Sequence, residues 1–235
     1  MKIHKLNLTS ENLFLVDQFF KVQFKGNYRY GQMGYFYWKL LKNKTSNGFI
    51  NSYIDKDKII ATTSIVPKTI LYKSKEYLVA EICDGFVDQK YQGKGLFINL
   101  IKKSKKDAKN FHFIYGTPNH LSLPVFLNNT SFQKINFFEV YSFIYPLSIK
   151  KKIRKRIGNN LASFINIFYK FYVKSEITLA RFRYNFSRTY TYKQIDSLDE
   201  SFNIFWNKAS KEWDFIFIRN KKMLSWRFDE NPTAY

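Results

Sequence analysis

Residues 92–97, Gln-Gly-Lys-Gly-Leu-Phe, are the segment whose residue types and spacing most clearly point to chemistry. An apolar run ends just before them, and a run of helical spacing begins at Gly95 without an acidic residue at the junction. The start of a helix presents free backbone N–H groups and the positive end of the helix dipole, which suits an anion. Glycine also lets a ligand approach the backbone closely, so we expect a phosphate to bind here. The alternative is a glycine turn that merely lets a helix pack against a strand.

Other chemistries find no matching motif in this sequence. A dinucleotide-binding turn requires Gly-x-Gly-x-x-Gly in the first βαβ unit and an acidic residue about 20 positions later, and neither is present. A nucleotide-binding P-loop would need Gly-Lys followed by Ser or Thr, which the sequence lacks. No group of His, Cys, Asp and Glu has metal-ligand spacing, and no Ser–His–Asp order stands out, so we expect no metal.

Hydrophobic spacing predicts the elements that would position this segment. A strand over 2–8 and helices over 10–24 and 31–43 come first, and strands over 48–54, 58–66 and 69–87 follow, the last turning at 73–75. A helix over 95–109, a strand over 111–117, a short helix and a β run over 132–147 complete the series. This order predicts an α+β fold, an α/β sandwich with a mixed sheet flanked by helices.

The sequence FVDQKYQGKGLF, residues 86–97, resembles motif A of the Gcn5-related N-acetyltransferases, the GNAT superfamily. That motif is Gln or Arg-x-x-Gly-x-Gly or Ala after a strand ending in Val. Val87, Gln92 and Gly95 match, whereas Phe97 replaces a small residue. Residues 116–132 are similar to the family's asparagine and following helix: Asn119 matches, and Ser-Phe at 131–132 replaces Gly-Phe. The resemblance covers about residues 2–147, one GNAT unit.

The resemblance implies a splayed mixed sheet that holds coenzyme A between its fourth and fifth strands. Acetyl-CoA or another acyl-CoA is then the expected cofactor, and the expected activity is transfer of its acyl group to a small amine or an amino sugar. The pantetheine arm would pair with Phe86 and Val87, and the pyrophosphate would lie on the backbone of the glycine segment. The cofactor-binding residues implied in this way are Phe86, Val87, Gln92, Gly93, Lys94, Gly95, Leu96, Phe97, Asn119 and Ser122.

The resemblance also implies a general base, and two acidic residues qualify for that role. Glu81 has the position of the base in histone-acetyltransferase-like members, and Asp84 is the second candidate. Residues three apart face opposite sides of a regular strand, but Gly85 could mark a bulge that re-aims either carboxylate. Phe126 stands where the family has a general-acid tyrosine and cannot donate a proton, and Tyr115 and Ser122 are nearby substitutes. Either solvent protonates the thiolate, or the fold has lost acyl transfer.

The end of the chain repeats the spacing of its beginning. Residues around Trp226 match those around Trp38 at an offset of 188, and the start of a helix near residue 9 matches one near 197 at the same offset. We therefore expect three parts: a GNAT-like acyl-CoA-binding domain over 1–147, a basic and aromatic connector over 148–188, and an incomplete second GNAT-like unit over 189–235, as if the chain were truncated or split. The alternative is a helical cap on the first domain.

Two such units in one chain resemble the tandem-GNAT acyltransferases associated with surface-polysaccharide biosynthesis. They are also similar to the aminoacyltransferases of peptidoglycan bridges, which use aminoacyl-tRNA as the donor, although a coenzyme A site argues against that donor. A GNAT-like binding or scaffold module without catalysis, engaging an anionic partner, is the alternative from a different class.

The charge balance favours anionic partners. The chain has 39 basic and 18 acidic residues, a net charge of +21. Six of the basic residues lie within 150–156, and an apolar, aromatic run follows. Residues 149–174 are either a peripheral contact with an anionic membrane or an interdomain helix, and a nucleic-acid partner is not expected. A lone cysteine, Cys83, and the lack of an uncharged run of 18 residues indicate a cytoplasmic protein.

Overall fold

The computed structural model describes residues 2–24, 34–135, 148–186 and 195–233. They belong to two compact units, the first made of Met1–Lys134 and Asp196–Tyr235 and the second of Ile135–Ile195. Each unit is described separately. The predicted domain boundaries at 147 and 188 were based on a repeat in the sequence. The division into compact units does not test that repeat, so these boundaries stay a prediction.

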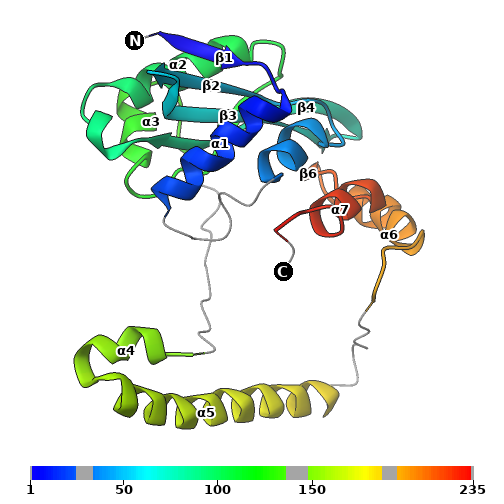
Figure 1. The fold of residues 1–235 in the computed structure, drawn as a ribbon. Helices are drawn as coiled ribbons and strands as arrows, with labels where there is room; N and C mark the ends of the chain where they lie inside the picture. The colour runs from blue at the N-terminus through cyan, green and yellow to red at the C-terminus, as the bar shows by residue number, and fades with distance from the viewer. Residues whose placement is uncertain (1, 25–33, 136–147, 187–194, 234–235) are drawn as a thin grey trace. The chain divides into compact units, whose positions relative to one another are not determined.

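Unit 1 is built on a mixed sheet of six strands, which confirms the predicted α+β class (Figure 1). Five strands lie in the order β1-β2-β3-β4-β5, and β6 pairs with β3. Their bounds are β1 (Ile3–Leu6), β2 (Phe49–Asp55), β3 (Lys58–Tyr72), β4 (Lys75–Val87), β5 (Ile114–Gly116) and β6 (Phe215–Phe217). All neighbours are antiparallel except β4 and β5, which are parallel. The parallel pair at one end is therefore the place where two strands point their carboxyl ends to the same edge.

The strand β3 corrects one prediction, because it runs unbroken through the gap expected between 66 and 69. Pro67 lacks a backbone N–H group and is tolerated in strands where that group has no ladder partner. The pairing of β2 with β3 ends at Ile65, and the carbonyl of Pro67 accepts a hydrogen bond from Asn43 Nδ2 at 3.1 Å instead. The N–H and C=O groups of one residue point to the same side of a strand. The missing N–H group of Pro67 would therefore also face Asn43, where β2 no longer pairs, and no hydrogen bond between strands is lost. The hairpin turn lies at Lys73 and Ser74, as predicted, with both residues at positive φ.

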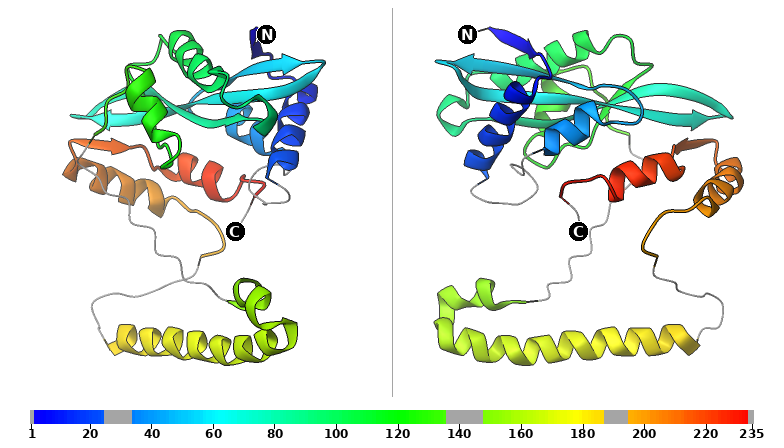
Figure 2. Two further views of the ribbon diagram at one scale, coloured as in Figure 1. Left: turned by 90° about the vertical axis from the view of Figure 1, so that its left-hand side faces the viewer. Right: turned by 45° about the vertical axis from the view of Figure 1, so that its right-hand side comes forward.

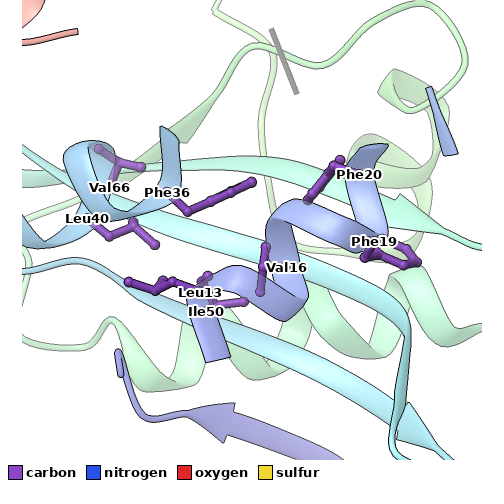
Figure 3. Close-up of a cluster of buried hydrophobic side chains, with 8 residues drawn as sticks. All are labelled: Leu13, Val16, Phe19, Phe20, Phe36, Leu40, Ile50 and Val66. Atoms are coloured by element: carbon purple, nitrogen blue, oxygen red, sulfur yellow. The ribbon is translucent and has the colours of Figure 1, made fainter. Parts of the chain in front are cut away.

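Helices cover both faces of the sheet (Figure 2). On one face lie α1 (Ser10–Gln23) and the helical turn η1 (Tyr37–Leu41). The side chain of Thr9 starts α1 by accepting a hydrogen bond from Asn12 N. Apolar residues of α1 at helical spacing then meet η1 and the sheet in one buried cluster (Figure 3), made of Leu13, Val16, Phe19, Phe20, Phe36, Leu40, Ile50 and Val66.

The opposite face is covered by α2 (Leu96–Asp107) and α3 (Leu123–Asn129), and the short turn η2 (Gln89–Tyr91) joins β4 to α2. The alternation of side chains along the strands separates the two cores: Ile50 and Val66 face α1, whereas their neighbours Phe49 and Ile65 belong to the second core. Both faces of the central strands are thus covered, which explains why β3 is buried over most of its length although it contains several threonines and a serine.

The C-terminal segment of unit 1 contains α6 (Ser201–Ala209), η3 (Ser210–Glu212), β6 and α7 (Lys221–Phe228). Trp226 of α7 is 3% exposed, and its ring stacks on Trp38 with centroids 4.7 Å apart. Trp38 Nε1 donates to the Trp226 carbonyl at 2.7 Å, and Trp226 Nε1 donates to the Trp38 carbonyl at 3.2 Å. This reciprocal contact joins the two tryptophans that the repeat aligns. The predicted second unit itself stays a prediction, and its opening strand falls on residues outside those described.

The described part of unit 2 contains two helices, α4 (Lys150–Ile157) and α5 (Asn159–Phe186), joined at Gly158. Asn166 Oδ1 of α5 accepts hydrogen bonds from Ser148 Oγ and from the backbone N–H groups of Ile149 and Lys150, so it caps the start of α4. Most of the β run predicted over 132–147 lies outside the described residues. Among the helices that the structure describes, none combines the length and the apolar character needed to cross a membrane.

A first prediction concerns Asp17, which is 4% exposed and accepts a hydrogen bond from Gly34 N at 3.1 Å. Burial raises the pKa of Asp17 from 3.8 to about 6, although bonds from the Gly34 and Phe36 backbone oppose the shift. The folded protein therefore holds this proton more tightly than the unfolded chain, and the stability so gained is lost as the pH rises through 6. Replacing Asp17 by Asn should make the melting temperature fall less between about pH 4 and pH 7 than in the unaltered protein.

Thermal melts at several pH values measure this difference. Glu11→Gln, an exposed acid on the same helix, is the matched control and should leave the pH profile unchanged. Parallel profiles for Asp17→Asn and the unaltered protein would contradict the assignment.

A second prediction concerns the contact of the C-terminal segment with η1. Trp226→Ala should lower the free energy of unfolding by about 3 kcal/mol, because it opens a large cavity and removes the hydrogen bond to the Trp38 carbonyl. Trp213, which is 60% exposed in the same segment, is the control, and Trp213→Ala should change stability by about 0.5 kcal/mol or less. Urea unfolding measures the free energy of unfolding of both variants. Equal effects would mean that α7 does not pack on the sheet in solution.

Candidate functional site

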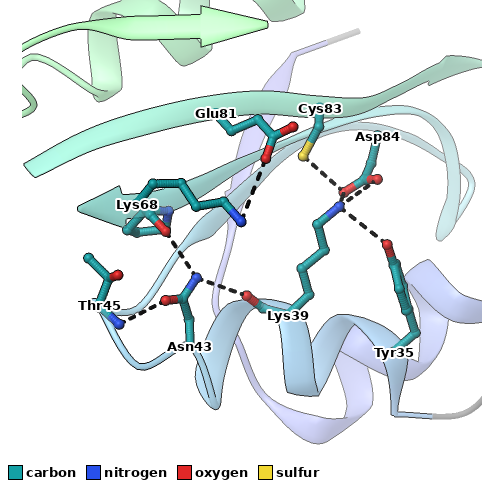
Figure 4. A network of polar contacts seen from close by, with 9 residues as sticks. Tyr35, Lys39, Asn43, Thr45, Lys68, Glu81, Cys83 and Asp84 are labelled. Carbon is teal, nitrogen blue, oxygen red and sulfur yellow. Dashed lines mark hydrogen bonds and ion pairs between the residues drawn. The ribbon is translucent and has the colours of Figure 1, made fainter. Parts of the chain in front are cut away.

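The predicted bulge lies in β4 and decides where the two candidate carboxylates point. Ser64 pairs with Cys83 and Thr62 with Phe86, so that Asp84 and Gly85 both lie opposite the single residue Thr63. Asp84 adopts φ 50, which is uncommon for a residue other than glycine. The irregularity turns the Asp84 side chain toward η1, where Glu81 and Cys83 also point (Figure 4). Both predicted catalytic carboxylates therefore lie on one face.

Asp84 is engaged in a buried ion pair. Its side chain is 2% exposed, and both of its oxygens accept from Lys39 Nζ, at 2.9 and 2.8 Å. Burial lowers the pKa of Lys39, but the attraction of Asp84, Cys83 and Tyr35 together with the hydrogen bond holds it well above its ordinary value. Lys39 is therefore charged, and it neutralises Asp84. A carboxylate bound at both oxygens is poorly suited to remove a proton from a substrate.

Glu81 is less constrained than Asp84. Its nearest charged partner is Lys68 of β3, with Nζ 3.8 Å from Oε2, and the side chain remains 22% exposed. On β5, Tyr115 is the register partner of Glu81. Burial, followed by the negative charge of Glu81, raises the pKa of Tyr115 well above its ordinary value, so the phenol stays protonated. Glu81 thus lies beside a cation and a neutral hydroxyl group.

The C-terminal segment also contributes to this site, which the sequence did not predict. Lys68 Nζ lies 5.2 Å from the centre of the Trp226 ring. Burial lowers the pKa of Lys68 although Glu81 opposes the shift, and the positive charges of Lys39 and Arg227 lower it further. The signal in the sequence was Lys68 itself, a cation between the apolar pairs at 65–66 and 70–71. Trp226 was noticed only as part of the repeat, and nothing in the sequence placed Trp226 or Arg227 beside Lys68, because that depends on how the segment docks.

The glycine segment forms an open turn where β4 leaves its parallel neighbour. The last pair between them is Ile82 with Gly116, and in the described part of the chain no strand lies beside residues 83–87 on that side. Gly93 and Gly95 have φ of 77 and 72, and a Cβ at either position would meet nothing within 4 Å. The turn is therefore both left-handed and unfilled, which only glycine adopts readily.

The start of α2 has unused backbone donors. Gly95 is the N-cap, no side chain caps the helix, and the first helical hydrogen bond runs from Asn99 N to Gly95 O at 3.1 Å. The N–H groups of residues 96–98 then have no acceptor within the helix. No acidic side chain lies in the first turn. An anion could therefore bind at this end of α2, and the predicted phosphate site stays a prediction.

Two residues of the motif have roles that the resemblance did not imply. Gln92 Nε2 donates to the Val87 carbonyl at 3.0 Å and so ties the loop to the end of β4. The ring of Phe97 lies directly over Gly85, where a Cβ would come within 2.5 Å of it. Phe126 is 7% exposed and packs edge-to-face on Phe97, with centroids 6.1 Å apart. Phe126 is therefore a core residue.

Asn119 and Ser122 form a turn at the start of α3. Asn119 Oδ1 accepts from the backbone of Leu121 and Ser122 at 3.1 and 2.9 Å, and from Ser122 Oγ at 3.0 Å. Because β4 and β5 are parallel, this turn follows β5 at the same edge of the sheet at which the glycine turn follows β4. The predicted cofactor-binding residues thus lie at the end of β4, in the glycine turn and the first residues of α2, and in the turn before α3. Among the described residues, no group of three His, Cys, Asp or Glu could hold a metal ion.

No family model matches the sequence, and no curated protein matches it. Among solved structures, an aminoglycoside acetyltransferase from an uncultured soil metagenomic sample, in complex with trehalose, is 16% identical, with a TM-score of 0.48 over 61% of this chain and 96% of that one.

Two further structures are similar to the chain in the same way. A predicted acetyltransferase with acetyl-CoA from Clostridium acetobutylicum is 19% identical, with a TM-score of 0.45 over 60% of this chain and 95% of that one. A transcriptional regulator from Bacillus halodurans is 13% identical, with a TM-score of 0.46 over 61% and 99%. These are partial similarities with TM-scores below 0.5, and the fold of this chain is defined by its own strands and contacts.

Proposed function

We propose that the protein is an acyl-CoA-dependent N-acyltransferase that transfers an acyl group, such as acetyl, to a small amine or an amino sugar. The observation that carries the proposal is the open, left-handed glycine turn between β4 and α2, at the point where β4 has no parallel neighbour. Free N–H groups, a helix start without acids and a strand side without a neighbouring strand are what a pyrophosphate with an extended arm requires.

The residues present fit coenzyme A at this place. The N–H groups at the start of α2 would bind the pyrophosphate. The pantetheine arm would pair with the side of β4 that has no neighbouring strand at Phe86 and Val87, where the Val87 carbonyl also accepts from Gln92 Nε2. When bound, the thioester supplies the activated acyl group. The remaining chemistry falls to side chains on the η1 face of β4.

We assign the role of general base to Glu81. A neutral amine must attack the thioester carbonyl, and the proton it releases must go to a nearby base. Glu81 is partly exposed and weakly paired, whereas both oxygens of Asp84 are bound to Lys39. Tyr115 is positioned to donate a hydrogen bond next to Glu81, but its raised pKa makes it a weaker acid than a thiol. Solvent then supplies the proton that the leaving thiolate needs.

A binding module without catalysis is the second candidate, and one observation favours it. The Phe97 ring covers Gly85 beside the strand where the pantetheine arm would lie, and no tyrosine replaces Phe126. The two candidates differ in turnover: the enzyme releases coenzyme A from acetyl-CoA when an amine is present, and the module does not.

Calorimetry with acetyl-CoA and with free coenzyme A tests the proposal, and Gly95→Glu locates the site. The added carboxylate would lie at the positive end of α2 and repel a phosphate, so we expect binding to weaken by about 100-fold or more. Gly158→Glu is the matched control, since Gly158 is also left-handed with nothing within 4 Å of a Cβ but lies in unit 2. No heat with either ligand at about 100 μM protein would contradict the proposed function.

A second test separates the two carboxylates. Glu81→Gln should lower the rate of acyl transfer at neutral pH by about 100-fold or more, because the amine loses its base, while the affinity for coenzyme A stays the same. Asp84→Asn should instead lower the melting temperature, because it leaves Lys39 buried without its partner. Release of free thiol in the presence of a panel of amines and amino sugars measures the rate. A rate loss in Asp84→Asn without a change in melting temperature, and none in Glu81→Gln, would reverse the assignment.

A further inference from the structure

The helix α5 of unit 2 has a long apolar face that no other described residue covers. Large apolar side chains recur at helical spacing along its 28 residues, and each is exposed by 37% or more. This apolar face of α5 consists of Leu161, Phe164, Ile165, Phe168, Phe171, Tyr172 and Leu179. A helix of this length extends about 42 Å. A stripe of this size is far larger than the isolated apolar residues found on most protein surfaces.

The opposite side of α5 holds its buried residues, and the beginning of this side contacts the start of α4. Ala162, Asn166 and Val173 are 0%, 7% and 4% exposed, and their spacing places them on one side, where Asn166 binds the start of α4. Figure 1 shows α4 folding back along the beginning of α5. The apolar face points away from this contact, because its residues lie roughly 150° around the helix from Asn166 and its neighbours. The packing inside unit 2 therefore leaves the face bare.

Charge identifies the occupant that fits such a surface. Residues 149–186 contain ten basic residues and one acidic residue, Glu176, so the segment has a net charge of +9. Arg154, Lys155 and Arg156 of α4 are exposed, as are Lys170 and Lys174 of α5. A second copy of the same segment would bring two like charges of this size together. An anionic partner with an apolar interior satisfies both the charge and the apolar face.

We propose that unit 2 binds the surface of an anionic lipid membrane, with α5 lying in the interfacial plane and its apolar face buried among the acyl chains. Such helices combine a large apolar face with lysines and arginines on the other side. The charged residues within α5 keep it in the plane of the membrane. A nucleic acid would match the charge but not the aliphatic side chains of Leu161, Ile165 and Leu179, which have no stacking role.

Vesicle sedimentation with the full chain tests this proposal and does not depend on the proposed function, because neither acyl-CoA nor an acceptor is involved. The protein is mixed with vesicles of phosphatidylcholine alone or of phosphatidylcholine with phosphatidylglycerol. We expect binding to the anionic vesicles to be at least about tenfold stronger and to weaken with salt.

Two pairs of variants separate the apolar from the charged contribution. Phe168→Ala with Phe171→Ala should weaken binding to anionic vesicles by at least about tenfold, because two large side chains no longer enter the membrane, while alanine favours the helix. The matched control is Ile204→Ala with Phe205→Ala on α6, which also removes two exposed apolar side chains. This control should change binding to anionic vesicles by less than about threefold.

The charged contribution is tested in the same way. Each basic residue near an anionic membrane contributes about a fivefold factor, so replacing Arg154, Lys155 and Arg156 by Gln should weaken binding by about 100-fold. The equally charged control, with Lys102, Lys106 and Lys109 replaced by Gln around the end of α2, should have an effect of less than about threefold. These three lysines are also exposed.

Several outcomes would overturn the proposal. Equal binding to neutral and anionic vesicles, no binding to either, or equal losses in the variants and their controls would each exclude a specific membrane surface. A dimer in sedimentation velocity that becomes a monomer in Phe168→Ala with Phe171→Ala would assign the face to a second copy. Binding to RNA without binding to vesicles would assign the charge to nucleic acid.

Discussion

The buried ion pair between Lys39 and Asp84 is the interaction on which the rest of unit 1 most depends. Asp84 has a left-handed backbone at φ 50, and a conformation of this kind persists only where the surrounding structure holds it. Two hydrogen bonds from Lys39 Nζ hold it here. Because Lys39 belongs to η1 and Asp84 to β4, the pair fixes η1 against the sheet. It also places the adjacent Trp38, on which the C-terminal segment packs.

The same part of β4 shows how packing and chemistry constrain each other. Gly85 is required because the Phe97 ring occupies the space of a side chain, whereas Gly93 and Gly95 are required for their left-handed conformation and have open space around them. Three glycines within eleven residues thus serve two different purposes. The phenylalanine that departs from the GNAT pattern is accommodated by the glycine next to the bulge, so the core closes over β4 while the turn beyond it stays open.

How much could be predicted from the sequence depended on the range of the interactions involved. The start of α2, the hairpin at residues 73–75 and the bulge near Gly85 are decided by a few neighbouring residues, and the sequence was sufficient for them. The partners of Glu81 and Asp84 were not predictable, because Lys68 and Lys39 reach them only through the register of β3 and the docking of η1. Pro67 was misleading as a strand break, since its effect depends on where β2 ends. The three-residue strand β6 is too short to give a pattern of its own.

The repeat in the sequence gives the arrangement around the two carboxylates a simple interpretation. At the offset of 188 that aligns Trp38 with Trp226, Lys39 aligns with Arg227. Lys39 neutralises Asp84, and Arg227 lies close enough to Lys68 and Tyr115, the neighbours of Glu81, to affect the pKa of both. Two helical segments that match in sequence therefore meet through equivalent tryptophans, and each brings a cation toward one end of the same stretch of β4. The two aligned segments thus contribute to one site, because the register of their tryptophans also fixes where Lys39 and Arg227 lie. The second GNAT-like unit itself stays a prediction.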